Sequence, residues 1–415
     1  MSQCPYSQHA LGQGATFQQG PPLELMRTIR EHGGPVSWHE DEQLGGYWAV
    51  MRQKELDIVS KNPLLFSSER AGIAYQDIPP EMLELQRLTL INMDPPGHLR
   101  YRKLVNQAFK PRYVEALHER FVEIFDETMA PILKKNQCEF VTEISCELPL
   151  IAICEILGVP AEDRAMFFRC TNTMLEEDED IILDKAGEDL RMAAQFELFA
   201  YADKVMEKYR DNPQDDIVGT LLSCELDGER LTEDEFRSFF MLLIIAGNET
   251  TRTATSHGMR LLMEHPEQFQ LLVDNPALVE DAIEEILRYT APIQCMRRTA
   301  MQDTELGGQK ISEGDKIMLF YQSSNHDETV FSEPGKFDIT RAQREEVRNA
   351  HRSFGVGEHF CLGSHLARLE LKVAFDGIVK HLRNPRMIEP PVWVKSNFIN
   401  GIREMQIAYD VANNH

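Results

Sequence analysis

The chain has no apolar run long enough to cross a lipid bilayer. Its longest uninterrupted apolar stretch, residues 239–246, is far shorter than the roughly 20 residues that a membrane-spanning helix requires. The N-terminus shows no basic segment followed by an apolar run, so we expect neither a signal peptide nor a membrane anchor. The sequence therefore predicts a cytoplasmic protein.

The chain also lacks closely spaced cysteines, and it has fewer basic than acidic residues. The eight cysteines are scattered and include no Cys-x-x-Cys pair, which argues against a zinc site and against a disulfide framework. The 43 Lys and Arg residues are outnumbered by 67 Asp and Glu residues. The resulting net charge of −24 argues against nucleic acid or anionic lipid as a general partner.

No Gly/Ser-rich or Pro-rich linker divides the chain, so residues 1–415 are expected to form one domain. The clearest element is a helix over residues 232–265, where Thr232 and Glu235 form a capping box and Pro266 ends the apolar stretch that follows. A helix of this length must run through the core. Further helical and strand-like patterns predict a mainly α fold with small β-sheets. The helices are expected at 99–109, 113–134, 193–209, 276–289 and 362–382, and short strands at 46–51 and 316–321.

The chemistry is expected at Cys361. This residue lies in the segment FGVGEHFCLG, residues 354–363, directly before a helical run of apolar residues. At the start of a helix, the helix dipole and the free N–H groups of Leu362 and Gly363 would favour a thiolate, the form that ligates metals. Gly355 and Gly357 would allow the loop backbone to approach a flat cofactor closely. An isolated cysteine in this position would more simply be an ordinary buried thiol.

The segment around Cys361 matches, position by position, the haem-binding signature F-G-x-G-x-H-x-C-x-G of the cytochrome P450 family. The chain resembles the soluble bacterial members of that family. The resemblance implies an α-rich triangular prism that holds haem b between the long helix and the helix after Cys361. It also implies that Cys361 is the thiolate ligand of the iron, that Phe354 and Gly363 border the haem, and that His359 lies near a haem propionate.

The sequence AGNETT, residues 246–251, interrupts the middle of the long helix with residues that form helices poorly. These threonines could simply bond back to the preceding turn. The segment also resembles the family's A-G-x-[DE]-T-T motif. That resemblance implies that Ala246 and Gly247 line the haem and that Glu249 and Thr250 deliver protons to iron-bound dioxygen. A local distortion of the helix is expected near Gly247.

Basic residues elsewhere match the family's positions for binding the haem propionates. His98 and Arg102, in the pattern D-P-P-x-H-x-x-x-R, lie one helical turn apart, and Arg298 occupies a further such position. With His359, these residues could neutralise two buried carboxylates. A separate resemblance, to the family's E-x-x-R motif, implies a buried structural network of Glu285, Arg288 and Arg341.

The resemblance implies a mono-oxygenase that hydroxylates a hydrophobic small molecule with dioxygen. Because no flavin or iron–sulfur domain is fused to the chain, a separate ferredoxin and ferredoxin reductase are expected to supply two electrons. Residues 396–401 look similar to members that act on terpenoids, sterol side chains or branched lipids. Two alternatives are a peroxide-driven haem-thiolate enzyme and a non-catalytic haem-binding sensor. Glu249 and Thr250 argue against both.

Two surfaces follow from the same resemblance. Substrate contacts are expected from residues 71–90 and 170–191 and from Ile245, Ile293 and Phe398. A basic patch near the haem is expected to steer an acidic ferredoxin despite the negative net charge. Its members would be Arg100, Lys103, Lys110, Arg352, Arg368 and Lys372.

Overall fold

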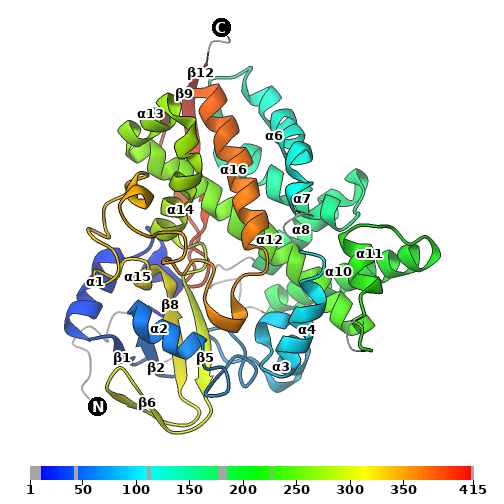
Figure 1. Ribbon diagram of the computed structural model, residues 1–415, viewed down its shortest axis with the longest axis vertical. Coiled ribbons are helices and arrows are strands. Elements are labelled where there is room, and N and C mark those ends of the chain that lie inside the picture. The colour runs from blue at the N-terminus through cyan, green and yellow to red at the C-terminus, as the bar shows by residue number, and fades with distance from the viewer. Residues whose placement is uncertain (1–10, 42–44, 110–113, 176–184, 226–227, 413–415) are drawn as a thin grey trace.

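Helices fill most of the molecule, and its small sheets gather on one side (Figure 1). The structure is a computed structural model that describes residues 11–41, 45–109, 114–175, 185–225 and 228–412. In the view of Figure 1 the outline is roughly triangular. The mainly α architecture with small β-sheets is therefore confirmed.

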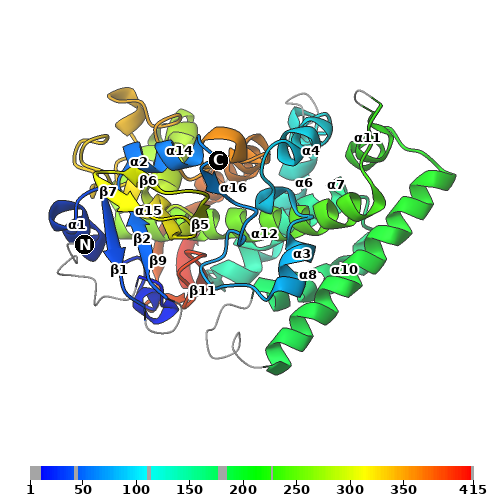
Figure 2. The same cartoon turned by 90° about the horizontal axis from the view of Figure 1, so that it is seen from below.

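Helix α12 (Glu233–Glu264) crosses the middle of the molecule (Figure 2). Its capping box forms as predicted: Thr232 Oγ1 accepts from the Glu235 N–H at 3.2 Å, and the Thr232 N–H donates to Glu235 Oε2 at 2.8 Å. Pro266 starts the next helix, α13 (Pro266–Asp274). Because these signals are local, the sequence placed both ends of α12 within one residue.

The helices with the most extensive contacts to α12 are α7 (Glu147–Ile156), α10 (Lys185–Asp211), α14 (Val279–Thr290) and α16 (Ser364–His381). The contact with α14 and α16 depends on Gly258. A Cβ atom there would lie 2.3 Å from the Phe375 ring and 2.8 Å from the Ile286 side chain. This close approach fixes α16, and with it the loop that carries Cys361, relative to α12.

The largest sheet has five strands in the order β1-β2-β8-β5-β3. Its central strand, β8 (Lys316–Phe320), runs parallel to β2 (Tyr47–Val50), and Trp48 lies opposite Ile317. Strand β5 (Cys295–Ala300) runs antiparallel to β8 and carries Arg298. The other two strands are β1 (Val36–His39) and β3 (Phe66–Ser67).

A second sheet, of order β4-β12-β9, covers the far end of α16. Its strands are β4 (Gln137–Glu139), β12 (Gln406–Val411) and β9 (Leu382–Met387). Two hairpins, β6 (Thr304–Leu306) with β7 (Gln309–Ile311) and β10 (Val392–Trp393) with β11 (Ile402–Glu404), complete the strands of the described residues.

The remaining helices lie around this frame. They are α1 (Leu23–His32), α2 (Gln53–Ser60), α3 (Pro80–Gln86), α4 (Gly97–Val105), α6 (His118–Ile132), α8 (Arg164–Leu175), α11 (Ile217–Ser223) and α15 (Tyr321–Ser324). The helix expected at 193–209 is longer, since α10 spans Lys185–Asp211. Among the residues that the structure describes, no helix is both long and apolar enough to cross a membrane.

Candidate active site

Cys361 lies in a tight loop directly before α16. The Cys361 N–H donates to the Phe354 carbonyl at 2.8 Å, which closes the loop on itself. Gly355 and Gly357 have φ angles of 70° and 78°, which side chains rarely tolerate. A Cβ on Gly357 would lie 2.7 Å from the carbonyl oxygen of Ser60, the last residue of α2. Gly357 therefore permits packing of the loop on α2.

Opposing influences act on the Cys361 thiol. Burial raises its pKa, while a hydrogen bond from the Gly363 N–H and the charges of Arg102 and Arg368 oppose that rise. Helix α16 begins at Ser364, two residues later than predicted, because residues 362–363 form a turn. The expected N–H contact to the sulfur nevertheless forms through Gly363. Burial outweighs these contributions, so the pKa of Cys361 lies above its ordinary value. The Gly363 N–H and the two arginine charges are the groups that would stabilise a metal-bound thiolate.

Four basic side chains converge beside this loop. His98 and Arg102 lie on α4, Arg298 on β5 and His359 in the loop itself. The rings of His98 and His359 are 4.3 Å apart, and Arg102 Nη2 donates to the Phe360 carbonyl at 2.5 Å. The sequence had predicted this grouping, and the structure brings all four together.

The four basic side chains lack anionic partners. Within the described part of the chain, none of them forms an ion pair with a carboxylate. Both ring nitrogens of His98 are buried without a hydrogen-bond partner, and Arg298 is 3% exposed. Burial, reinforced by the neighbouring arginines, lowers the pKa of His98 to about 4 and that of His359 to about 2. The two histidines are therefore neutral near pH 7, and the charges of this cluster are those of Arg102 and the buried Arg298. An anionic group bound here would pair these charges and accept hydrogen bonds from the histidines.

On α12, Ala246 is exposed and Gly247 and Thr250 are partly exposed, although the helix crosses the core. Thr250 Oγ1 donates to the Ala246 carbonyl at 2.7 Å. The prediction of a helix distortion near Gly247 is wrong, because α12 is one uninterrupted α-helix from Glu233 to Glu264. The Thr250 hydroxyl satisfies the carbonyl one turn back without opening the helix, and its oxygen can still accept a hydrogen bond.

Glu249 lies on another side of α12, where it forms an ion pair with Arg252. Its side chain is 5% exposed, and Thr253 Oγ1 is 3.4 Å from its Oε1. Arg252 also hydrogen-bonds to Cys146. The sequence reasoning missed this pairing, although the spacing of three residues on a helix was a usable signal.

Glu370, on α16, was also missed by the sequence reasoning. It is 3% exposed, its Oε2 has no hydrogen-bond partner, and it bonds to Thr251, the neighbour of Thr250. Burial raises the pKa of Glu370 to about 8, although the bond to Thr251 opposes the rise. A signal was present, since Glu370 falls four residues after Leu366 on the buried face of its helix.

The structural network expected from the E-x-x-R motif is confirmed. Arg288 Nε and Nη2 donate to Glu285 at 2.7 and 2.9 Å, and Arg341 Nε donates to the same carboxylate at 3.2 Å. All three side chains are at most 1% exposed. A carboxylate shared by two arginines satisfies the buried charge that each would otherwise leave unpaired.

The basic patch expected near the cysteine loop is mostly neutralised. Arg100 pairs with Glu235 at 2.6 Å, Arg352 with Asp57 at 2.7 Å, Arg368 with Glu284 at 2.6 Å and Lys372 with Asp376 at 3.0 Å. Lys110 lies outside the described residues. Lys103 is exposed, and no described carboxylate pairs with it. Four of the six residues expected to steer a ferredoxin thus have their charge paired with a carboxylate.

Comparison with known proteins decides the family. A family model described as Cytochrome P450 matches residues 83–384. The chain belongs to the cytochrome P450 family. It is 39% identical over 390 residues to a steroid C26-monooxygenase of Rhodococcus jostii, an alignment that covers 91% of this chain and 80% of that protein. It is 35% identical over 403 residues to a methyl-branched lipid omega-hydroxylase of Mycobacterium tuberculosis, with 96% and 90% covered.

A solved structure gives the same result for the fold. The structure of a Mycobacterium marinum cytochrome P450 in complex with pseudoionone superposes with a TM-score of 0.84, at 32% sequence identity, and covers 93% of this chain and 94% of that one. The P450 fold expected from the sequence is thus confirmed, and this P450 is a mono-oxygenase.

The residues present in this P450 fit a haem. A buried cysteine receives the Gly363 N–H and lies near the charges of Arg102 and Arg368, which would stabilise a metal-bound thiolate. Basic side chains without carboxylate partners lie beside it, and both ring nitrogens of His98 are unpaired. Haem carries two propionates, which the basic cluster could neutralise. The exposure of Ala246 in a core helix indicates room for a flat group between α12 and the cysteine loop.

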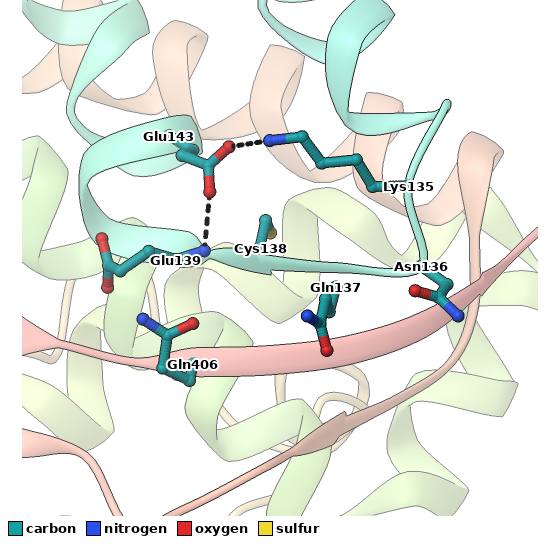
Figure 3. A pocket seen from close by; sticks show the side chains of 7 residues that line it. All are labelled: Lys135, Asn136, Gln137, Cys138, Glu139, Glu143 and Gln406. Carbon is teal, nitrogen blue, oxygen red and sulfur yellow. Dashed lines mark hydrogen bonds and ion pairs between the residues drawn. The ribbon is translucent and has the colours of Figure 1, made fainter.

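A separate hollow of about 460 Å³ is lined by residues 135–139, which include β4, by Glu143 and by Gln406 of the neighbouring strand β12 (Figure 3). Its lining is mostly polar, and Glu143 has partners among the other lining residues. Lys135 Nζ pairs with Glu143 at 2.6 Å, and the Glu139 N–H donates to Glu143 at 2.9 Å. The hollow contains no residue of the haem site and does not resemble an apolar substrate pocket.

Proposed function

We propose that this P450 hydroxylates a steroid or a methyl-branched lipid on its aliphatic chain, using dioxygen and two electrons from a ferredoxin and its reductase. The two relatives' activities support this substrate class, as does the resemblance of residues 396–401 noted above. A terpenoid remains a second substrate class under the same proposal. We also propose that residues 1–415 act as one domain. The cytoplasmic location stays a prediction.

The observation that carries the proposal is the convergence of Cys361 with four basic side chains that lack anionic partners. We infer that haem b binds there, that the Cys361 thiolate would hold its iron, and that the iron would supply the chemistry that activates dioxygen. His98, Arg102, Arg298 and His359 would hold the propionates. The faces of the macrocycle would be bordered by Ala246, Gly247, Phe354 and Gly363.

The protein's own part in the reaction is to deliver protons. Thr250 can accept a hydrogen bond at its oxygen while it donates to Ala246. Glu249 would pass protons inward from the Arg252 side of α12. Among the expected substrate contacts, Ile293 is joined to Ile399 by a β-bridge, which links the end of α14 to the loop before β11. Residues 176–184 of the expected contacts lie outside the described residues.

The cofactor proposal is tested on the purified holoenzyme. The reduced protein with carbon monoxide should show the red-shifted Soret band of a thiolate-ligated haem, and Cys361→Ser should abolish that band. A Cys361→Ser variant that kept both the band and the activity would overturn the proposal.

Substrate class and electron source need a second experiment. Steroids, branched lipids and terpenoids that displace an axial water should shift the Soret band, and the binders are then assayed for hydroxylated product. Turnover with ferredoxin, its reductase and NAD(P)H, and little turnover with peroxide, would support the proposal. The reverse result would favour a peroxide-driven enzyme, and no turnover with either would favour a haem-binding sensor.

A further inference from the structure

A buried ion pair joins α14 to α16 directly behind the cysteine loop. Arg368 donates to Glu284 through both Nε, at 2.6 Å, and Nη2, at 2.9 Å. The two side chains are 15% and 9% exposed. A two-pronged pair of this kind fixes the plane of the guanidinium as well as its position.

A histidine holds the carboxylate of this pair from the other side. His351 Nε2 is 3.0 Å from Glu284 Oε2, while His351 Nδ1 accepts from the Ser353 N–H at 3.3 Å. Because Nδ1 accepts, Nε2 carries the proton and donates to Glu284. Burial opposes ionisation of Glu284, but hydrogen bonds from His351 and Arg368 outweigh it and lower its pKa to about 2. Glu284 is therefore a fixed anion that positions Arg368.

The guanidinium that Glu284 positions lies over an aromatic ring of the cysteine loop. The centre of the Arg368 guanidinium is 4.5 Å from the centroid of the Phe354 ring. The Phe354 carbonyl accepts the Cys361 N–H at 2.8 Å, so one residue links this charge to the sulfur-bearing residue. Charges act strongly over such distances in a partly buried site.

We propose that Arg368, positioned by Glu284 and His351, is held over Phe354 to withdraw electron density from the Cys361 thiolate and so sets the reduction potential of the haem iron. This inference rests on the proposed haem-thiolate function. Arg368 acts through Phe354 and Cys361 and is a positioning and tuning residue, not a catalytic one. If the Arg368–Glu284 pair served only to join α14 and α16, the guanidinium would not need to lie over the Phe354 ring.

The test is the reduction potential of the substrate-free holoenzyme, measured by spectroelectrochemistry. Arg368→Gln should make the iron harder to reduce, because the thiolate then donates more strongly. We expect about a tenfold shift in the reduction equilibrium, which is about 59 mV more negative for one electron. The C–O stretching frequency of the reduced carbon monoxide complex should fall at the same time.

Arg368→Gln leaves Glu284 buried without its arginine partner, which can impair folding. Two further variants keep the test decisive in that case. Glu284→Gln/Arg368→Gln leaves no unpaired buried charge at this site and should shift the potential in the same direction. Arg368→Lys keeps the charge but loses the two-pronged geometry, and its shift should be intermediate.

The matched control is Lys372→Gln, one turn further along α16. Lys372 pairs with Asp376 at 3.0 Å and is 35% exposed, so the substitution removes the same charge from the same helix away from Phe354. It should change the reduction equilibrium less than twofold. Potentials and C–O frequencies of the Arg368 variants equal to those of wild type or of Lys372→Gln would overturn the inference. A wild-type enzyme without the thiolate Soret band would instead contradict the proposed function itself.

Discussion

The Glu249 carboxylate forms an ion pair with Arg252, one turn further along α12, and is shielded from solvent. The two side chains are 5% and 17% exposed, and Arg252 is also tied to Cys146. The acid expected to relay protons is thus held by a cation that also contacts Cys146, the residue before α7. A relay through Glu249 has to pass through this ion pair.

The pair leads to a prediction that separates chemistry from stability. Glu249→Gln should slow turnover roughly 10²-fold, because an amide cannot relay a proton, with substrate-binding spectra unchanged. The variant leaves Arg252 buried and unpaired, so the free energy of unfolding should fall by about 3 kcal/mol. Glu249→Gln/Arg252→Gln should recover the stability in urea denaturation and keep the slow rate. Wild-type turnover in that double variant would show that protons arrive by another route.

Thr250 should control the coupling of electron consumption to product formation. Thr250→Ala removes the hydroxyl that faces the expected haem side, so electrons should be consumed with release of peroxide instead of product. Thr250→Ser should restore most of the product yield. Thr255 makes the same type of bond, to the Thr251 carbonyl at 2.9 Å, but is buried further along α12, so Thr255→Ala is the matched control. Peroxide and product are measured per NAD(P)H, and equal yields in the Thr250→Ala and Thr255→Ala variants would contradict the role.

Sequence reasoning predicted the features of this site that local signals or contiguous motifs specify. The ends of α12 follow from the capping box of Thr232 and from Pro266, and the basic cluster follows from short motifs whose side chains the fold brings together. The charge pairings were not predictable in the same way. Arg368 meets Glu284 across 84 positions of the chain, so their contact depends on how α14 and α16 pack. The continuous helix at Gly247 was missed because poor local helix propensity is overridden by packing in the core.

Glu370 should make stability depend on pH. Its pKa is raised from 4.5 to about 8 in the folded protein. Between these values the folded state keeps a proton that the unfolded state has released, so the free energy of unfolding should fall as the pH rises. Glu370→Gln removes this dependence. The free energy of unfolding of Glu370→Gln, relative to that of wild type, should rise between pH 5 and pH 9 by on the order of 4 kcal/mol.

Urea denaturation at several pH values measures the effect of Glu370. Asp376→Asn, on the same helix but 42% exposed, is the control and should run parallel to wild type. If the stability of Glu370→Gln also ran parallel to wild type over this pH range, Glu370 would not be protonated in the folded protein.

The paired charges around the cysteine loop change how a ferredoxin should be steered. Arg100, Arg352 and Arg368 each hold a carboxylate, so they contribute little net positive potential to an approaching acidic protein. Lys103, on α4, is exposed without a described carboxylate partner, and the Phe360 side chain, next to Cys361, is 41% exposed. These two residues mark the surface nearest the thiolate that an acidic partner could contact.

Lys103→Glu should therefore slow reduction by ferredoxin at low ionic strength, where charge steering is strongest, and the difference from wild type should shrink as salt is added. Reduction by dithionite and the substrate-binding spectra should not change, because neither depends on docking. Lys310→Glu is the matched control, since Lys310 is also exposed but lies in the β6–β7 hairpin, away from α4 in both views (Figures 1 and 2). Stopped-flow reduction over a range of salt concentrations measures the effect. If Lys103→Glu and Lys310→Glu are reduced equally fast, the ferredoxin docks on another face.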